Sequence, residues 1–507
     1  TLIEGDLVFN GTSAQTPTIG SSLSKLEINN NFGVTLSSNL DITSGLLLTD
    51  GQLNTGGNQL TLKASNTSTA YLSEDCSGQG SISGEITVEQ YVPEAGDGHH
   101  YLSTPMSGLS LSEWSDDFNF KLGDSYFPHL YYYDEANTQW VTPDAVSDAL
   151  VVGRGYTGYF SGEIVVDITG VPNTGDITIP LTNNGDGWNL IGNPFTSPID
   201  WDGVQIPSGV SGAVYVWDHI PAIWGRYATY LDGIGTNGGS NVVPMMQGFF
   251  MSSAVNTNIV FYCEDRIATD NPGVFYRKAA ATDPLIRIQA GGFGYTTDAV
   301  VRFKSNATED YDETSDALLF PAGDPKGMDF GTISSDDRAL VINTVPQQAM
   351  NKKIPLYLKI GTKGDYEIEM TDLKHFSNSA NVLLHDDDLG IVHSLKSGPY
   401  VFNSELSSGK GRFFIEATDI VLGKKGSDPK EEFSWAVQNN QLIITFEKAF
   451  EQDHSLEIYN IVGQSVNIQM LQKGNNVFIV PIADLKKNKS YIVRVHDTSH
   501  TFKLARL

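Results

Sequence analysis

Residues 26–62 read LEINNNFGVTLSSNLDITSGLLLTDGQLNTGGNQLTL, a series of short apolar triplets separated by Gly, Asn and Ser. The triplets begin at Leu26, Val34, Leu40, Leu46, Leu53 and Leu60. Their starts are therefore 8, 6, 6, 7 and 7 residues apart. A coiled chain with one short strand on each face of a coil would produce this rhythm. The alternative is a plain β-meander, but the short, even spacing favours a β-solenoid.

Short strand signals continue through the rest of the chain. Its 507 residues include 50 Gly, and 40% of them are hydrophobic. Runs rich in aromatic and β-branched residues alternate with clusters of Gly, Asn, Pro and Asp, which is typical of strands and tight turns. We predict an all-β protein with a β-solenoid-like segment in 1–77, a β-sandwich or jelly-roll-like module in 78–265, a β-sandwich in 266–420, a linker in 421–432 and a C-terminal Ig-like β-sandwich in 433–507.

The charge of the chain limits its partners. The net charge is -28, and no basic face is visible, so nucleic-acid binding is disfavoured. Residues 431–507 hold eight acidic and eight basic side chains, so the whole negative charge lies before them. Such acidity fits a protein exposed to the medium. No apolar window is long enough for a transmembrane helix, and Thr1 already lies in a strand-like pattern, which indicates a processed or truncated N-terminus.

Few residues suggest chemistry. Cys76 and Cys263 form no metal motif, and the sequence leaves open whether they are paired or two buried thiols. His99 and His100 are neighbours on a predicted strand, so they point to opposite faces and favour a structural role. The sequence contains no nucleophile elbow and no phosphate-binding loop, so we do not expect an enzyme.

Two acidic stretches contain the carboxylates that a calcium site needs. Residues 386–388 and 309–316 are rich in Asp and Glu, but neither has the full loop pattern of a calcium site. We interpret both as solvated acidic turns. If a Ca²⁺ site exists, Asp310, Asp312 and Asp316 are its candidate ligands. No other cofactor is expected.

Aromatic residues gather between positions 131 and 224. They are Tyr131, Tyr132, Tyr133, Trp140, Trp188, Trp201, Trp217 and Trp224. They could form a stacking face for carbohydrate, but runs of aromatic residues in strands are more often core.

The C-terminal stretch SLEIYNIVGQSV, residues 455–466, carries the most specific pattern. With the strands that follow it, the stretch resembles the type A C-terminal sorting domain of cargo proteins of the Bacteroidota type IX secretion system. The positions that match are Ile458, Tyr459, Asn460, Gly463, Gln464, Val466, Ile482, Leu485, Tyr491–Val495 and Phe502–Leu504. Two departures are the segment 488–490, where the family has Gly before the Tyr, and the end at Leu507 instead of a short basic tail.

The resemblance implies a secretion signal that an outer-membrane shuttle barrel and the translocon recognise. The resemblance implies that the following residues take part in this recognition: Tyr459, Asn460, Gly463, Gln464, Tyr491, Val493 and Lys503. From the residues, we expect the turn at Gly463–Gln464 and an inward-facing Tyr459 to hold the fold of the module.

The rest of the chain is similar to large repetitive surface proteins of the same bacteria. The similar segments include LVFNGTSAQT, HHYLSTPM and WNLIGNPFTSPIDW. The resemblance implies a secreted or cell-surface, outer-membrane-associated, adhesin-like structural protein, whose partners include surface glycolipid or glycans. The alternatives are an extracellular carbohydrate-binding or carbohydrate-active protein, and a component of the gliding-motility or export apparatus.

Overall fold

The computed structural model describes residues 5–74, 76–93, 98–118, 122, 129–220, 223–267, 283–321, 323, 325–377, 380–418, 433–438, 440–446, 448–487, 489–496 and 501–506. Regular structure in these residues consists of strands and a few 3₁₀ turns, so the all-β prediction is confirmed. None of the described segments forms a helix of the length and apolarity needed to span a membrane.

The chain divides into two compact units. Unit 1 comprises Thr1–Ala281 and Glu313–Asp324, and unit 2 comprises Thr282–Asp312 and Pro325–Leu507. We describe each unit by itself.

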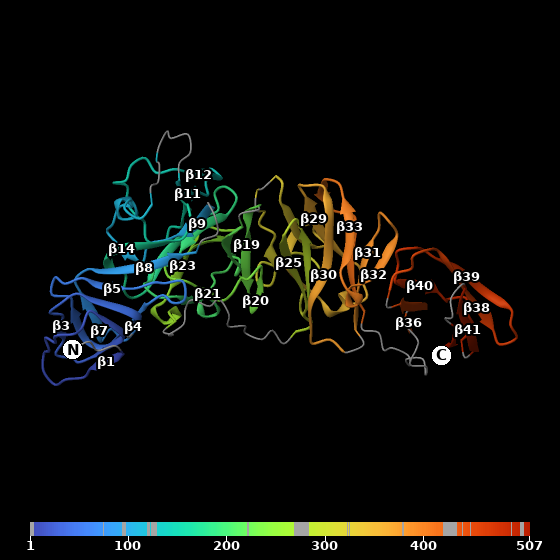
Figure 1. The fold of residues 1–507 in the computed structure, drawn as a ribbon, viewed down its shortest axis with the longest axis horizontal. Coiled ribbons are helices and arrows are strands. Elements are labelled where there is room, and N and C mark those ends of the chain that lie inside the picture. Colours follow the sequence, from blue (N-terminus) through green and yellow to red (C-terminus); the bar gives the residue numbers. More distant parts are fainter. Residues whose placement is uncertain are drawn as a thin grey trace. The chain divides into compact units, whose positions relative to one another are not determined.

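Unit 1 begins with strands that pair in parallel (Figure 1). They are β1 (Asp6–Phe9), β2 (Ser22–Asn29), β3 (Val34–Thr35), β4 (Leu40–Asn54), β5 (Leu60–Leu62), β6 (Tyr71–Glu74) and β7 (Gly80–Ser83). The register aligns apolar residues in columns, one of which runs Leu7, Leu26, Leu46 and Leu72. Parallel pairing between strands one coil apart is what a coiled chain produces. The solenoid itself stays an interpretation of this pairing.

The N-terminal sheet does not end at the predicted boundary after residue 77. Strand β5 pairs with β8 (Ile86–Val92), which pairs with β14 (Ile164–Pro172), and β14 pairs with β10 (Met106–Ser107). One hydrophobic core extends from Phe9 to Met246. The boundary therefore falls inside a continuous sheet and core.

A disulfide joins Cys76 to Cys263, with their Cα atoms 5.6 Å apart. Cys76 lies between the parallel strands β6 and β7, and Cys263 begins the 3₁₀ turn η3 (Cys263–Asp265) after β23 (Thr257–Phe261). The alternative of two buried free thiols is therefore wrong. The pairing closes a loop of 187 residues within unit 1.

Two further sheets of unit 1 carry the candidate aromatic residues other than Trp201. The first has the order β12-β11-β13-β9, and the second has the order β16-β22-β18-β19-β20. Their strands are β9 (Gly98–Leu102), β11 (Leu130–Asp134), β12 (Gln139–Val141), β13 (Tyr156–Phe160), β16 (Trp188–Gly192), β18 (Val214–Ile220), β19 (Ile223–Leu231), β20 (Ile234–Thr236) and β22 (Gly248–Ser252).

The first part of unit 2 is one large sheet, part of which is labelled in Figure 1. Its strand order is β32-β31-β35-β29-β27-β28-β25-β24-β30-β33, and β34 also pairs with β29. The strands are β24 (Leu285–Gly292), β25 (Tyr295–Phe303), β27 (Met328–Ile333), β28 (Ala339–Val345), β29 (Ile354–Ile360), β30 (Gly364–Lys374), β31 (Asn381–Asp386), β32 (Ile391–Ser394), β33 (Tyr400–Ser404), β34 (Ser407–Gly409) and β35 (Phe413–Thr418).

This sheet is curled into a nearly closed, barrel-like form. Its outermost strands β32 and β33 follow each other in sequence, with only η5 (Leu395–Ser397) and a few residues between them. So short a connection requires the two ends of the sheet to approach each other. The structure thus shows one large curled β-sheet in 285–418, and the sandwich predicted for 266–420 stays a prediction.

The C-terminal module of unit 2 has two antiparallel sheets. One contains β36 (Phe433–Gln438), β37 (Gln441–Phe446) and β40 (Val477–Pro481). The other has the order β39 (Ser465–Leu471), β38 (His454–Asn460), β41 (Lys489–Val495) and β42 (Thr501–Arg506). One core takes residues from both sheets, including Leu442, Ile458 and Val493. The predicted linker 421–432 lies outside the described residues.

Candidate functional site

The motif residues of the C-terminal module build the turn between β38 and β39. Asn460 Oδ1 accepts hydrogen bonds from the backbone N–H groups of Val462 and Gln464, at 3.1 and 3.0 Å. Asn460 Nδ2 donates to Gln464 Oε1 at 3.0 Å. Gly463 has a φ of 84°, which favours glycine. Asn460, Gly463 and Gln464 therefore fix the shape of this turn, as the sequence predicted for its Gly463–Gln464 part.

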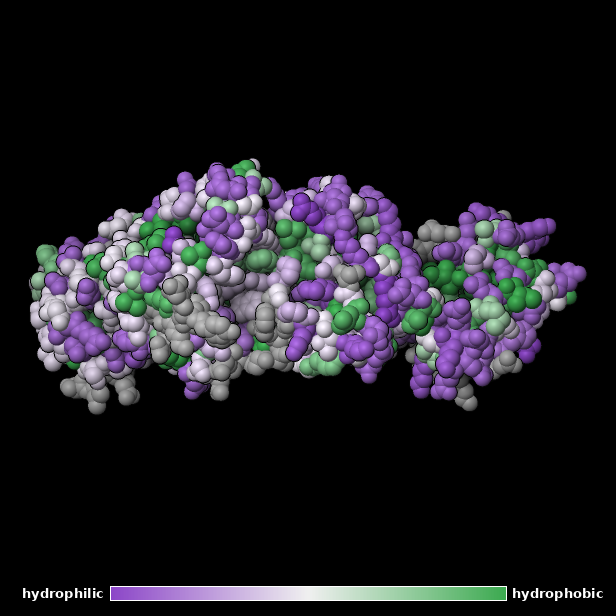
Figure 2. Space-filling view, turned by 90° about the horizontal axis from the view of Figure 1, so that it is seen from above, coloured by the Kyte–Doolittle hydropathy of each residue, from purple (hydrophilic) through white to green (hydrophobic). Residues whose placement is uncertain are grey.

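The turn and the strand after it expose an unusual number of apolar side chains. We call this surface the apolar edge; its residues and exposed fractions are Ile461 (75%), Val462 (74%), Val466 (44%), Ile468 (65%) and Met470 (60%). The last three alternate along β39, so they share one face of a strand that has only one partner in its sheet. Hydrophobic residues on the surface of this module are green in Figure 2. Contiguous exposed apolar side chains often mark an interaction surface.

Tyr459 faces outward, and the expectation of an inward tyrosine is wrong. Leu456 and Ile458 are fully buried, so the alternation of the strand turns Glu457 and Tyr459 to the outer face. The Tyr459 hydroxyl donates to Glu457 Oε2 at 2.5 Å, and His496 Nε2 lies 2.9 Å from the same oxygen. Side-chain hydrogen bonds from Ser465, Tyr459 and His496 lower the pKa of Glu457 to about 2.

The other predicted recognition residues lie in different settings. Val493 is fully buried and Tyr491 is 6% exposed, so both belong to the core of the module. The Tyr491 hydroxyl accepts a hydrogen bond from the backbone N–H of Lys486 at 2.9 Å. Lys503 pairs through its backbone with Ile492, and its side chain lies outside the described residues. The surface that a partner could touch is therefore the apolar edge and the outer face around Tyr459.

The calcium candidates do not form a metal site within the described residues, where no three His, Cys, Asp or Glu side chains are grouped suitably. Asp310 and Asp312 belong to unit 2, whereas Asp316 belongs to unit 1 and is buried. Asp310 Oδ1 accepts a hydrogen bond from Ser335 Oγ.

His99 and His100 are partly buried among aromatic rings. His99 packs against Tyr159, its Nδ1 lies 3.1 Å from Thr157 Oγ1, and His100 packs against Phe160. Burial, together with nearby histidines, lowers the pKa of both side chains to about 4. They are therefore neutral near pH 7, as expected of packed rings.

The depressed pKa values predict acid sensitivity of unit 1. Unfolded histidine has a pKa near 6.5, so the unfolded chain binds more protons between about pH 6.5 and pH 4. These two histidines therefore destabilise unit 1 as the pH is lowered through this range, whereas Asp117 of the same unit, whose pKa burial raises to about 7, acts in the opposite direction. Denaturant titrations monitored by tryptophan fluorescence would measure this pH dependence, since six of the seven tryptophans belong to unit 1.

The matched variants for this titration are His99→Gln and His393→Gln. The first should reduce the pH dependence, whereas the second, in unit 2, should leave the fluorescence transition unchanged. An equal shift of the unfolding midpoint between pH 6.5 and pH 4 in His99→Gln and in the parent would contradict the prediction.

Half of the candidate carbohydrate-stacking residues belong to one aromatic network, and only Trp201 of the described candidates is buried. Tyr133, Trp140, Trp188 and Trp217 join Tyr101, Tyr215, Tyr227, Phe250 and Phe320 in one network of ring contacts. Trp140 is 42% exposed, whereas Tyr215 and Phe250 are buried.

The remaining candidates lie outside this network. Trp201 packs on Phe249 in a separate core, and Tyr132 lies beneath Arg154. Tyr131 contacts His99, and the side chain of Trp224 is outside the described residues. Apart from Trp140, no described tryptophan has more than about a third of its surface exposed, so the structure does not show the planar exposed row that carbohydrate stacking requires.

A cleft of about 490 Å³ lies on the curled sheet of unit 2, beside an irregularity in its strands. Strand β29 pairs first with β35, at Pro355↔Phe414, and then with β34, at Leu358↔Gly409. Between these two pairs, the four residues 410–413 lie opposite the two residues 356 and 357 of β29, which makes a bulge at Lys410–Arg412. Gly409 and Gly411 have φ of 105° and 99°, a conformation that suits glycine. Such bulges redirect side chains.

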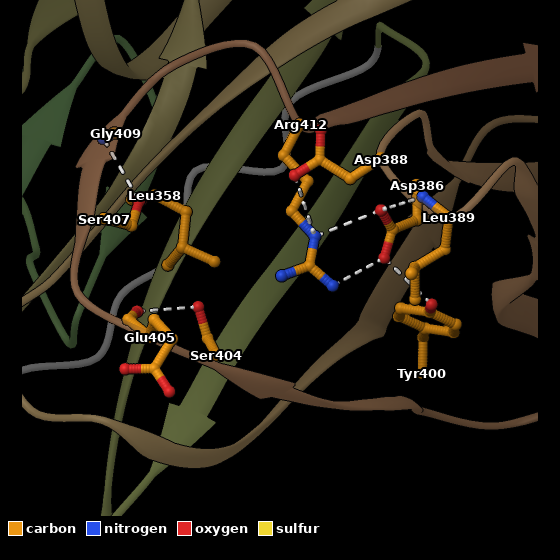
Figure 3. Close-up of polar contacts among 10 residues, drawn as sticks. All are labelled: Leu358, Asp386, Asp388, Leu389, Tyr400, Ser404, Glu405, Ser407, Gly409 and Arg412. Carbon is orange, nitrogen blue, oxygen red and sulfur yellow. Dashed lines mark hydrogen bonds and ion pairs between the residues drawn. The ribbon is translucent and has the colours of Figure 1, made fainter.

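The bulge places Arg412 in a network with a buried carboxylate (Figure 3). Arg412 Nε and Nη2 donate to the two carboxylate oxygens of Asp386 at 3.0 and 2.7 Å, and the Tyr400 hydroxyl donates to Asp386 at 3.0 Å. The Asp386 side chain has no exposed surface. The guanidinium carbon lies 4.9 Å from the centre of the Phe402 ring and 4.5 Å from that of Phe413. Arg412 is therefore held in one position at the cleft.

This network was not predictable from the local sequence. The expectation of a solvated acidic turn at 386–388 is wrong for Asp386, although Asp388 is 68% exposed and Asp387 pairs with Lys353 at 2.8 Å. Burial opposes charge on Arg412, but its hydrogen bonds and ion pair with Asp386 raise its pKa overall. The segment GKGR, in which two glycines precede the arginine closely, was the one local signal of a bulge.

A comparison with protein families gives one match. The model of the family described as a domain of unknown function, DUF8693, matches residues 6–416. The chain belongs to this family. A search of curated proteins finds no match.

The DUF8693 match covers the parallel strands, the aromatic network and the cleft. Asp386, Tyr400 and Arg412 lie within it, whereas the C-terminal module at 433–507 lies beyond its last residue. The cleft and the apolar edge can therefore be considered as two separate sites, one in the family region and one after it.

Proposed function

We propose that this chain is a secreted or cell-surface structural protein of adhesin type, exported by a type IX secretion system. Its C-terminal module is the export signal, which an outer-membrane shuttle barrel and the translocon recognise. The observation that carries the proposal is the apolar edge, because the motif residues Asn460, Gly463 and Gln464 hold the turn that exposes Ile461 and Val462.

The physical argument is that exposed apolar side chains favour association. Fully burying a side chain the size of Ile or Val contributes roughly 1.5–3 kcal/mol. A strand with one free edge can also add a partner strand through its backbone. The apolar edge combines both features on β39. It therefore suits recognition by a protein partner.

The disulfide supports an extracytoplasmic location. Disulfides form and persist in oxidising compartments and are rare in the cytosol. Cys76–Cys263 joins distant parts of unit 1. The acidic composition, with a net charge of -28, fits the same location.

A carbohydrate-binding role is the second candidate. One observation favours it: Trp140 is 42% exposed at the margin of the aromatic network and packs at 5.4 Å from Tyr133. Loss of glycan-array binding in a Trp140→Ala variant would support this role. An array without signal for the parent chain would argue against it.

Export tests the first proposal. In a Bacteroidota host with a type IX system, we expect the double variant Ile461→Asp, Val462→Asp to reach the cell surface at least tenfold less than the parent. In this variant, two apolar side chains that the partner would cover are replaced by carboxylates. These carboxylates would have to lose their hydration when the partner binds, which weakens binding. Protease accessibility of intact cells, with immunoblots of periplasm and medium, gives the measurement.

The matched control is Val437→Asp, which changes a 41% exposed residue on the other sheet of the same module. It should be exported like the parent. Normal export of the double variant would show that the export machinery does not recognise the apolar edge. Export of the parent in a strain without the translocon would overturn the proposed route.

A further inference from the structure

Within the residues that the structure describes, only some of the N–H donors of Arg412 have a hydrogen-bond partner. A guanidinium carries five N–H donors. Asp386 takes the edge formed by Nε and Nη2, which leaves Nη1 and the outer hydrogen of Nη2 on the other edge. In Figure 3, Nη1 has no drawn contact and is turned away from Asp386, toward the side where Ser404 and Glu405 lie. The free edge has the geometry to hold a second carboxylate through two hydrogen bonds.

The free edge is fixed before any ligand arrives. Asp386 is fully buried and is held by the Tyr400 hydroxyl, and the rings of Phe402 and Phe413 lie against the guanidinium. A side chain already restrained in this way loses little freedom on binding, so more of the interaction energy becomes affinity. The buried Asp386 thus positions Arg412 without itself reaching the ligand.

Part of the rim of the cleft is apolar. Leu389 and Leu406 line it and are 58% and 68% exposed, which leaves aliphatic surface that a ligand could cover. Phe413 and Leu358 also line the cleft. An aliphatic body next to the guanidinium would therefore be bound on both its apolar and its charged side.

The nearby charges limit the charge of the ligand. Lys410 pairs with Asp337 at 2.6 Å, and Glu405 pairs with Lys363 at 3.4 Å. Asp388 lies 4.0 Å from Arg412 Nε and is 68% exposed, so it repels additional negative charge. The chain as a whole carries a net charge of -28. A polyanion is therefore disfavoured, and a ligand with one carboxylate is favoured.

We propose that this cleft binds a small ligand that carries a single carboxylate on an aliphatic body. The carboxylate accepts hydrogen bonds from the free edge of Arg412, and the aliphatic body covers Leu389 and Leu406. The carboxyl end of a peptide with an apolar last residue and a short-chain aliphatic acid share this chemistry.

Calorimetric titration of the intact chain tests the proposal with three probes. N-acetyl-leucine and hexanoate carry the carboxylate, whereas N-acetyl-leucinamide has the same aliphatic body without it. We expect at least one carboxylate to bind, and N-acetyl-leucinamide to bind at least tenfold more weakly than N-acetyl-leucine. Stronger binding of N-acetyl-leucine would assign a peptide end, and stronger or equal binding of hexanoate would assign an aliphatic acid.

Two variants that change only exposed side chains locate the site. Leu406→Ser should weaken the binding of the preferred carboxylate at least threefold. Val401→Ser is the matched control, because Val401 is 65% exposed in the same sheet but does not line the cleft, and it should bind like the parent. Three results would each overturn the proposal. The first is that neither carboxylate binds at about 10 mM, a concentration that would detect even very weak binding. The others are that the amide binds as well as N-acetyl-leucine, or that both variants lose binding equally.

Discussion

Replacing both cysteines, as Cys76→Ser with Cys263→Ser, is expected to lower the free energy of unfolding of unit 1 by about 4–5 kcal/mol. The disulfide closes a loop of 187 residues, and its loss restores to the unfolded chain the freedom that the loop had removed. Tryptophan fluorescence in a denaturant titration would measure the change, because the tryptophans before residue 225 all belong to unit 1.

Two controls separate the covalent link from the side chains. The single variant Cys76→Ser also breaks the disulfide, and it does so at an exposed position. Because the covalent link is the main contribution, this variant should lose nearly as much stability as the double variant. Dithiothreitol should destabilise the parent and leave the double variant unchanged. Equal unfolding midpoints for the oxidised and reduced parent would refute a stabilising role for the disulfide.

Truncation of Arg412 to alanine is expected to destabilise the curled sheet of unit 2 by roughly 3–5 kcal/mol. The substitution leaves the Asp386 carboxylate buried without its cation, and an uncompensated buried charge is costly. Hydrogen–deuterium exchange of β31 and β35 would report the loss, because Asp386 ends the first strand and Arg412 immediately precedes the second.

The double variant Arg412→Ala with Asp386→Ala removes both charges and is the matched control. It should be less destabilised than the sum of the two single variants, since a strong pairwise interaction makes the changes non-additive. Additive losses, or unchanged exchange in Arg412→Ala, would show that the pair does not stabilise the sheet.

The sequence could predict features that depend on neighbouring residues. The apolar triplets between Leu26 and Leu62 lie in β2 to β5, and the strands of the C-terminal module lie near the runs that predicted them. Turn residues were also predictable, since Asn460 and Gly463 act within a few residues of each other. The direction of Tyr459 was not, because a shift of one residue in the alternation reverses the face of every side chain.

Features that depend on distant residues could not be predicted in this way. The disulfide joins positions 187 residues apart, and nothing local to either cysteine indicates its partner. Asp386 and Arg412 meet because β31 pairs with β35 and a bulge turns the arginine toward the carboxylate. The curling of the large sheet likewise depends on its strand order, which brings β32 and β33 to opposite ends although they are neighbours in sequence.

The disulfide also determines which part of the chain would bear a mechanical load. A tension applied at residues 5 and 506 passes through the Cys76–Cys263 bond and bypasses the residues between them. If these residues unfolded while the bond held, the chain could not lengthen by their extended span, about 600 Å at ~3.4 Å per residue. The aromatic network members from Tyr101 to Phe250 lie inside this segment, so a pull along the chain would not draw them apart directly.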